Sequence, residues 1–171
     1  MKRFQTHIYT SYGPITVELV SGIVERTVRN FMNYVEDGFY DNTLIHRVVD
    51  NYLIQGGGFE REFIQKTTRP PIGNESADGL QNKRGTIAMA RFAEESDSAT
   101  SQFFINTKDN DELDYRDGDP ANPGYCAFGR VIEGMQVVEY IEGVGTTTMD
   151  DHKDVPIREI VIERIELVRK I

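Results

Sequence analysis

Apolar and polar positions alternate at both ends of the chain, which is the pattern of half-buried β-strands. Residues 4–8 and 15–19 each alternate in this way, with a glycine and a proline between them at 12–14. This arrangement predicts an N-terminal hairpin. The apolar, β-branched run 157–168 changes phase near Glu163, which predicts a long strand with a bulge.

Two segments show a helical period instead. The first has apolar residues on one face, at Val24, Val28, Phe31, Met32 and Val35. We expect this helix to begin near Ser21-Gly22 and to end at Gly38, because glycine commonly follows the last residue of a helix. A second, shorter helix is expected over residues 135–142, between two glycines.

The rest of the chain has the pattern of short strands joined by glycine-rich turns. Good candidates are residues 85–90, 102–105 and 125–132. Many short strands and two helices predict a mainly β fold, a closed antiparallel barrel whose open ends the helices cover. Two connections are long, residues 60–83 and 106–124, and long loops in a compact domain are often functional.

Composition narrows the range of partners and compartments. The 171 residues fit one domain, and the formal charge of −9 argues against nucleic acid and anionic membrane surfaces as partners. No run approaches the ~20 apolar residues of a membrane helix, and the first residues lack the apolar segment of a signal peptide. A single cysteine, Cys126, excludes an internal disulfide. Together these features favour the cytoplasm.

Arg47 is the first candidate for chemistry, because it stands between apolar residues on a segment with strand character. A buried arginine needs a partner or a purpose. Gln55 follows eight residues later, so on one continuous strand both side chains would share a face, and the glutamine could accept a hydrogen bond from the guanidinium. The alternatives are a structural ion pair or an exposed position for Arg47, and an ordinary satisfied polar residue for Gln55.

His46 is the obvious residue to consider as a general base, but alternation sends it to the face opposite Arg47. The chain has only three histidines, and none has a His or Cys at metal-ligand spacing. We expect His46 to be a structural residue near the site, bonded to the backbone, and we expect no metal site.

Residues 42–55, with Arg47 and Gln55, form a first block of candidates. A second block, residues 99–106, contains Gln102, Phe103 and Phe104. Alternation places Phe103 on one face and the other two on the opposite face. There the glutamine could grip a peptide backbone while the Phe104 ring packs a side chain. The alternative is a core phenylalanine pair with a glutamine at the barrel edge. The same choice between core and pocket applies to Tyr52, Leu53, Met89, Leu113 and Tyr125.

The run 56–58 of three glycines does not predict a phosphate cradle, because no Walker lysine or dinucleotide pattern surrounds it. We interpret it as a tight bend that permits close backbone approach. The serines at 96, 98 and 101 lack the context of a catalytic nucleophile, and no carboxylate pair stands out as acid and base. These features argue against a hydrolase or a metalloenzyme.

Several segments, taken in order, resemble the cyclophilins, the peptidyl-prolyl cis-trans isomerases, and most closely their small single-domain bacterial members. The matching segments are residues 27–31, 38–40, 45–58, 84–90, 101–105 and 127–129. The resemblance covers essentially the whole chain and implies one cyclophilin-like domain, residues 1–171. It also implies the family's closed eight-stranded antiparallel β-barrel capped by two α-helices.

The resemblance implies a role for each matching residue. Arg47 would be the catalytic arginine, and Gln55 the glutamine that supports it. Gln102 matches the glutamine that grips the peptide backbone. The remaining matches would line the proline pocket or contact the peptide: Tyr52, Leu53, Ala90, Arg91, Phe104, Leu113 and Tyr125.

The chain also departs from the family pattern. Ile45 replaces the phenylalanine of a Phe-His-Arg motif, and Asp50-Asn51 replaces a Pro-Gly turn. Tyr125 stands where many eukaryotic members have histidine. Glu112 stands at the pocket rim, where an aromatic residue is typical. A carboxylate offers no large apolar face, so we expect only weak binding of the inhibitor cyclosporin.

The resemblance therefore implies a monomeric peptidyl-prolyl cis-trans isomerase that needs no cofactor. Its partners would be proline-containing peptides and unfolded or nascent proteins. The alternative is a proline-peptide-binding or chaperone (holdase) module with little turnover, for which the arginine would be dispensable.

Overall fold

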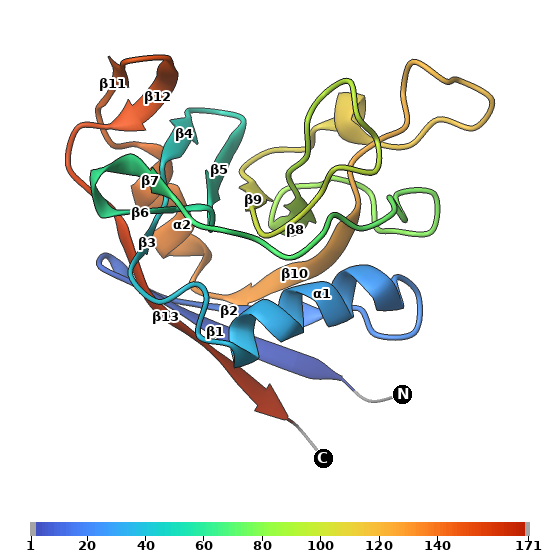
Figure 1. Cartoon of the computed structure of the whole chain (residues 1–171), viewed down its shortest axis with the longest axis horizontal. Helices are drawn as coiled ribbons and strands as arrows, with labels where there is room; N and C mark the ends of the chain where they lie inside the picture. The colour runs from blue at the N-terminus through green and yellow to red at the C-terminus, as the bar shows by residue number, and fades with distance from the viewer. Residues whose placement is uncertain (1–2, 170–171) are drawn as a thin grey trace.

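Four long strands form one side of the sheet, and they confirm the strands expected at the two ends of the chain (Figure 1). In this computed structural model, which describes residues 3–169, their order is β10 (Ala127–Glu133), β2 (Gly13–Leu19), β1 (Phe4–Thr10) and β13 (Val161–Arg169). β1 and β2 form the expected hairpin. The pairing of β13 with β1 skips Glu163, which is the expected bulge.

Shorter strands complete an 11-stranded sheet, and this sheet corrects the expected closed eight-stranded barrel. The order is β4-β5-β9-β8-β10-β2-β1-β13-β3-β6-β7, so within residues 3–169 the end strands β4 and β7 each pair with one neighbour. The fold is mainly β, with a curled sheet that forms part of a barrel. The short strands are β3 (Thr43–Leu44), β4 (Arg47–Val49), β5 (Leu53–Gly56), β6 (Phe59–Glu60), β7 (Ile64–Gln65), β8 (Thr86–Met89) and β9 (Phe103–Asn106).

The shortness of the strands at one end explains why the sheet does not close. β3, β6 and β7 have two residues each. Between β6 and β7 the 3₁₀ turn Arg61–Phe63 bends the chain, with left-handed φ values of 65° at Glu62 and 57° at Phe63. Segments this short carry no readable alternation, so the sequence pattern showed only a long loop there. The expected single domain also includes residues 1–2 and 170–171, which lie outside the described part of the chain.

The opposite end of the sheet is covered by a separate hairpin. Its strands are β11 (Thr146–Met149) and β12 (His152–Pro156), and β12 packs against β4. An unpaired edge strand invites pairing with another chain, so this hairpin protects the β4 edge. The sequence pattern did not predict it. The C-terminal strand also begins at Val161, later than the expected residue 157.

Both expected helices are present. α2 (Met135–Glu142) has the expected bounds, and α1 (Glu25–Glu36) is followed by Gly38 with a φ of 67°, which is the conformation that favours glycine after a helix. α1 packs against β13, and α2 packs against β2, β4 and β5.

The start of α1 differs from the prediction, because the chain still turns at Ser21-Gly22. The N-cap residue makes no side-chain bond. Instead, the backbone N and the Oγ1 of Thr27 donate to Glu75 Oε1 at 2.6 and 2.7 Å. A carboxylate at a helix N-terminus satisfies unpaired N–H groups and complements the helix dipole. The capping group comes from the long loop 60–83, so no local signal could reveal it.

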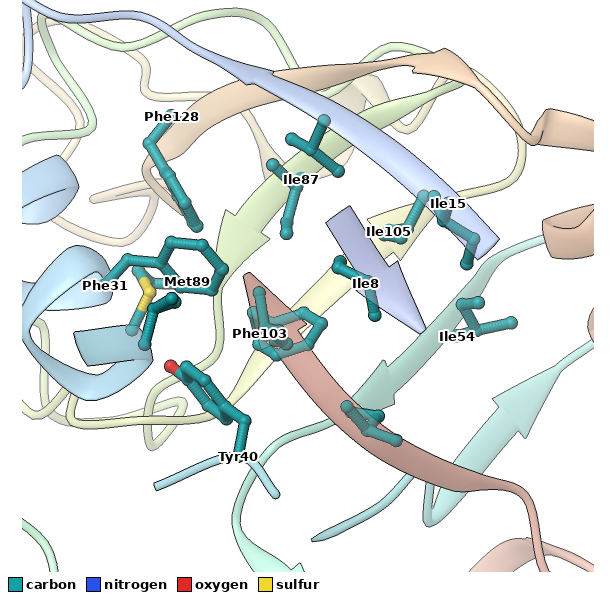
Figure 2. Packing of buried hydrophobic residues seen from close by; sticks show 14 of the residues in the cluster. Ile8, Ile15, Phe31, Tyr40, Ile54, Ile87, Met89, Phe103, Ile105 and Phe128 are labelled. Carbon is teal, nitrogen blue, oxygen red and sulfur yellow. The ribbon is translucent and has the colours of Figure 1, made fainter. Parts of the chain in front are cut away.

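The main core fills the space between the curled sheet and α1. Figure 2 shows Phe31 of α1 among aromatic and aliphatic side chains from the strands. Its ring centroid lies 5.1 Å from that of Phe128 and 5.7 Å from that of Phe103. A second, smaller cluster takes the alternate residues of β5, β8, β9 and β10 and contains Leu53, Ala88, Phe104, Leu113 and Ala127. The strands therefore bury both faces, and the second face carries the candidate site.

Candidate active site

The β4–β5 hairpin brings the first two candidate residues together. Arg47 on β4 pairs directly with Gln55 on β5, and the turn between the strands has Asn51 at a φ of 53°. The two residues therefore do not lie on one continuous strand, because a turn intervenes at Asp50-Asn51, where the resemblance places one. The conclusion that the two side chains share a face still holds, since directly opposite residues of an antiparallel pair project to the same side.

A chain of hydrogen bonds fixes the guanidinium. Arg47 Nη1 donates to Gln55 Oε1 at 3.1 Å, and Gln55 Nε2 donates to Gln102 Oε1 at 2.9 Å. Arg47 is half-buried and, among the described residues, makes no ion pair. Because Gln55 is neutral, the charge of Arg47 is not cancelled by its partner, and the other guanidinium N–H groups remain available to a ligand.

An apolar wall faces this arginine. On β9 the side chains alternate as expected, with Phe103 in the main core (Figure 2) and Phe104 in the second cluster. The rings of Phe104 and Tyr125 meet edge to face, with centroids 5.8 Å apart. Leu53 and Leu113 are buried beside them. Met89 belongs to the main core and does not line the candidate site.

These groups enclose a cavity of about 100 Å³. It brings together nine of the residues that the sequence singled out, which form its lining: Arg47, Tyr52, Leu53, Gln55, Ala90, Arg91, Phe104, Leu113 and Tyr125. Ligand pockets for drug-sized molecules are several times larger. A cavity of this size, with a wall of aromatic and leucine side chains and the Arg47 guanidinium at its edge, suits a small ring with a polar atom beside it.

Two larger hollows lie along α1, with volumes of about 440 and 590 Å³. Size alone does not identify a site. Neither hollow contains any of the candidate residues from the two sequence blocks. We therefore place the candidate active site in the smaller cavity, where a fixed donor faces an aromatic wall.

Two of the expected substrate-binding residues lie outside the cavity lining. Gln102 is half-buried and reaches the cavity through its bond to Gln55. Glu112 is exposed on the 3₁₀ turn Asp111–Leu113. Burial raises the pKa of Tyr52, and the negative charge of Glu112 raises it further. The carboxylate therefore acts on the rim of the cavity through its charge.

Arg91 lines the cavity, but its donors bond to the protein itself. Nε and Nη2 donate to Gly124 O at 3.2 and 2.9 Å, and Nη1 donates to Phe92 O and Ala93 O at 2.9 and 3.1 Å. Its guanidinium carbon lies 4.1 Å from the centroid of the Tyr125 ring. The side chain thus joins two loops and stacks on one wall of the cavity.

His46 points away from the cavity, as alternation requires. Its ring packs at 4.7 Å from the Phe59 ring and 6.2 Å from the Phe63 ring. Nδ1 is buried and has no hydrogen-bond partner among the described residues, so the expected backbone bond is not found at that atom. Burial, followed by the charges of His152 and Arg47, lowers the pKa of His46 to about 4. The ring is therefore neutral near pH 7.

The three glycines are required by close packing, which confirms the tight bend. A Cβ at Gly57, where φ is 91°, would lie 2.9 Å from both the Phe103 and Tyr40 rings. A Cβ at Gly58 would lie 2.6 Å from the Gln102 side chain. The bend lets β5 pass the second block closely enough for Gln55 and Gln102 to bond.

Sequence reasoning missed the polar groups behind the wall. Asn82, Asn106 and Asn110 are buried there and bond to one another. An asparagine in a loop is the ordinary signal for a turn, so the sequence offered no sign that these three converge.

Neither a metal cluster nor a membrane-spanning helix is found in residues 3–169. No three His, Cys, Asp or Glu side chains there lie together in a way that could hold a metal ion. No helix there is both long enough and apolar enough to cross a bilayer.

Known proteins similar to this chain share one description. The family model described as cyclophilin type peptidyl-prolyl cis-trans isomerase/CLD matches residues 5–167. Peptidyl-prolyl cis-trans isomerase B of Escherichia coli (strain K12) is 45% identical over 157 residues, covering 92% of this chain and 95% of that protein. The peptidyl-prolyl cis-trans isomerase cyp18 of Streptomyces antibioticus is 46% identical over 159 residues, covering 93% of this chain and 95% of that protein.

Solved structures agree with these sequence relatives. A crystal structure of a cyclophilin type peptidyl-prolyl cis-trans isomerase from Cryptosporidium parvum superposes with a TM-score of 0.79 at 26% identity, covering 98% of this chain and 99% of that one. The family model spans nearly the whole chain, and residues from both sequence blocks line the cavity. The chain belongs to the cyclophilin-type peptidyl-prolyl cis-trans isomerases, an enzyme family.

Proposed function

We propose that the chain accelerates Xaa-Pro rotation by donating a hydrogen bond from Arg47 to the prolyl nitrogen, in the cavity beside Phe104. The single observation that carries this mechanism is the placement of Arg47. Its guanidinium borders a small cavity that has an aromatic and leucine wall, and it is held by Gln55, a neutral side chain, at 3.1 Å. The chemistry needs no cofactor, since no group is transferred.

The mechanism follows from amide resonance. The barrier to rotation about a peptide bond is about 18–20 kcal/mol because the C–N bond has partial double-bond character. In the twisted state the nitrogen regains its lone pair and becomes a hydrogen-bond acceptor. A donor aimed at that nitrogen binds the twisted state more strongly than either planar isomer, and such differential binding is what accelerates a reaction. An arginine remains protonated at any working pH.

The remaining cavity residues would hold the substrate still. Phe104, Leu53 and Leu113, with the rings of Tyr52 and Tyr125, would enclose the proline ring. Gln102 and the backbone near Ala90 would grip the peptide chain, so that the part before the proline can turn while the ring stays in place. Arg91 would support this wall by stacking on Tyr125, since its donors are engaged within the protein.

The substrates we propose are proline-containing peptides and unfolded or nascent proteins, bound by a monomer in the cytoplasm. A Cryptosporidium parvum relative with the same fold was crystallised in the presence of the dipeptide Ala-Pro, which supports the first of these. Weak cyclosporin binding is proposed because Glu112 is exposed at the rim. A binding or holdase module without turnover is the second possibility, but it would have no use for the bond between Arg47 and Gln55.

A protease-coupled assay on an Ala-Pro peptide tests this function. We expect the wild-type chain to accelerate cis-to-trans exchange, and Arg47→Ala to lose on the order of 10²–10³-fold in kcat/KM, the usual cost of one transition-state donor. Arg47→Lys should also lose most of the activity, because one ammonium cannot replace the planar fork. Arg61→Ala is the matched control, since Arg61 is an exposed arginine that pairs with Glu159.

The outcomes separate the two candidate functions. Full activity in a folded Arg47→Ala protein would refute the mechanism. A wild-type protein that binds the peptide and suppresses aggregation of an unfolded client, yet does not accelerate exchange, would favour the holdase.

A further inference from the structure

Three asparagine side chains form a buried chain of hydrogen bonds behind the cavity. Asn82, Asn106 and Asn110 are 1%, 0% and 0% exposed. Asn110 Nδ2 donates to Asn106 Oδ1 at 2.8 Å, and Asn106 Nδ2 donates to Asn82 Oδ1 at 3.1 Å. Amides buried so completely are costly unless they are bonded. All three Nδ2 groups and the Oδ1 atoms of Asn82 and Asn106 are bonded, whereas Asn110 Oδ1 has no partner among the described residues.

Asn106 anchors this set of hydrogen-bonded asparagines to the sheet. Asn106 is the last residue of β9 and pairs with Leu53 of β5. Its Nδ2 also donates to Thr86 Oγ1 on β8 at 3.0 Å. Asn106 is therefore fixed to three neighbouring strands of the sheet that carries Arg47.

The other two members bond to the backbone of the cavity wall. Asn82 Nδ2 lies 3.2 Å from Leu113 O and 3.1 Å from Tyr125 O. Asn110 Nδ2 donates to Tyr52 O at 2.9 Å. These three wall residues lie outside the strands, on a turn, a 3₁₀ turn and a loop, so no strand pairing holds them in place.

Backbone bonds reinforce the same connections. Asn110 N donates to Asn82 O at 2.8 Å, and Leu113 N donates to Asn110 O at 3.0 Å. Tyr125 N donates to Leu113 O at 2.8 Å. Contacts that pass through Asn82 and Asn110 thus join the wall to the sheet, beside the bond that Thr107 N donates to Tyr52 O at 3.0 Å.

We propose that Asn82, Asn106 and Asn110 are positioning residues, which hold Tyr52, Leu113 and Tyr125 at a fixed distance from Arg47 and thereby set how tightly the proline ring is bound. This inference rests on the proposed function of the cavity. The wall contacts the ring alike in the planar and twisted states. Loss of uniform binding of this kind raises KM and leaves kcat nearly unchanged.

The test measures kcat and KM separately for Asn82→Ala, together with the affinity of the protein for an Ala-Pro peptide by titration. We expect KM and the peptide dissociation constant to rise about tenfold, which corresponds to ~1.4 kcal/mol, while kcat stays within about twofold of wild type. Asn110→Ala, which removes the bond to Tyr52 O but leaves Asn82 in place, should raise KM less. It serves as the test variant if Asn82→Ala does not fold.

Two controls separate positioning from general destabilisation. The Thr107 hydroxyl lies in the same loop and is buried without a partner among the described residues, so Thr107→Val removes a polar group that holds nothing and should leave KM unchanged. Val138→Ala makes a cavity under α2, where Val138 is fully buried. We expect it to lower the melting temperature, as we also expect of Asn82→Ala, but not to raise KM.

An Asn82→Ala protein that folds and has the KM and peptide affinity of wild type would overturn the inference. So would a rise in KM of equal size in Val138→Ala. Failure of the proposed function would look different, because wild type and Arg47→Ala would then exchange the peptide at the same rate. The peptide titration would still report whether Asn82 shapes the cavity.

Discussion

At the scale of single residues, Arg47 differs from the surface arginines in the kind of side chain to which it bonds. Arg69, Arg130 and Arg164 are exposed and pair with carboxylates. Arg47 is half-buried and bonds to the neutral amide of Gln55. A carboxylate partner would cancel the charge and occupy two donors, whereas an amide orients the guanidinium and leaves its field directed at the cavity.

The residue pattern predicted much of this site and missed what depends on distant segments. Alternation placed Phe104 and Phe103 on opposite faces, and His46 opposite Arg47, as the structure has them. It could not show that Arg91 donates to Gly124 O, because that bond joins residues far apart in the chain. A position matched by resemblance therefore does not fix what the side chain bonds to.

The buried His46 ring makes stability depend on pH. Its folded-state pKa is about 4, below the ~6.5 of an unfolded histidine. Above pH 6.5 the ring is neutral in both states and contributes no pH dependence. As the pH falls from ~6.5 to ~4, the unfolded chain binds a proton that the folded protein excludes, so stability is lost. At pH 4.5 the loss from this group should be roughly 2–3 kcal/mol.

Urea unfolding of wild type and His46→Phe at pH 7 and pH 4.5 measures this effect. Phenylalanine keeps the packing on Phe59 and cannot titrate. The variant should lose less free energy of unfolding between the two pH values, by about the amount given above, because carboxylate effects are common to both proteins. Equal losses in both proteins would show that His46 titrates normally.

At the scale of elements, the sequence predicted helices and strands whose hydrophobic pattern extends over many residues. It missed elements that are only a few residues long. α2 has the predicted bounds, and the bulge at Glu163 lies where the phase of the C-terminal run slips. The two-residue strands and the β11–β12 hairpin were missed. Their turns use left-handed residues other than glycine, such as Asp150 at 51° between β11 and β12 and Glu62 at 65° between β6 and β7, which the sequence does not distinguish from ordinary polar loops.

The bend after β5 requires glycine, and the free energy of unfolding that is lost when Gly57 is replaced can be measured. Gly57→Ala would force a Cβ into the Phe103 and Tyr40 rings at 2.9 Å with a φ of 91°. We expect a loss of about 3 kcal/mol or more in the free energy of unfolding, from backbone strain and overpacking together. Gly118→Ala is the matched control, since its φ is 72° and nothing lies within 4 Å. It should cost only ~1–2 kcal/mol.

Denaturant titrations of both glycine variants give the comparison. If Gly57→Ala costs no more than Gly118→Ala, the close approach of β5 to the second block is not what requires glycine there.

At the scale of the whole molecule, the negative charge gathers partly beside the candidate site. The loop 106–124 has six acidic residues against two basic ones, and Leu113, on the same loop, lines the cavity. Glu112 on this loop raises the pKa of the nearby Tyr52 hydroxyl. A negative field at the rim favours approach of positively charged peptides, and salt screens it over a Debye length of about 10 Å at 0.1 M.

Charged peptide pairs test the effect of this field. A substrate with lysine next to the Xaa-Pro bond should have a kcat/KM several-fold above that of its glutamate counterpart at low salt, and the ratio should approach one near ~1 M salt. Glu112→Gln should reduce the ratio at low salt only. A preference that does not change with ionic strength would point to contacts rather than to the field of the loop.

The central claim is that Arg47 binds the twisted prolyl bond better than the planar isomers. The most direct measurement is two-dimensional exchange NMR of an Ala-Pro peptide, which reports the on-enzyme exchange rate and the peptide affinity in one sample. We expect Arg47→Ala to slow exchange on the enzyme on the order of 10²–10³-fold, while the peptide dissociation constant changes only a few-fold. An unchanged exchange rate with lost affinity would show that Arg47 merely binds the peptide, and would contradict the account.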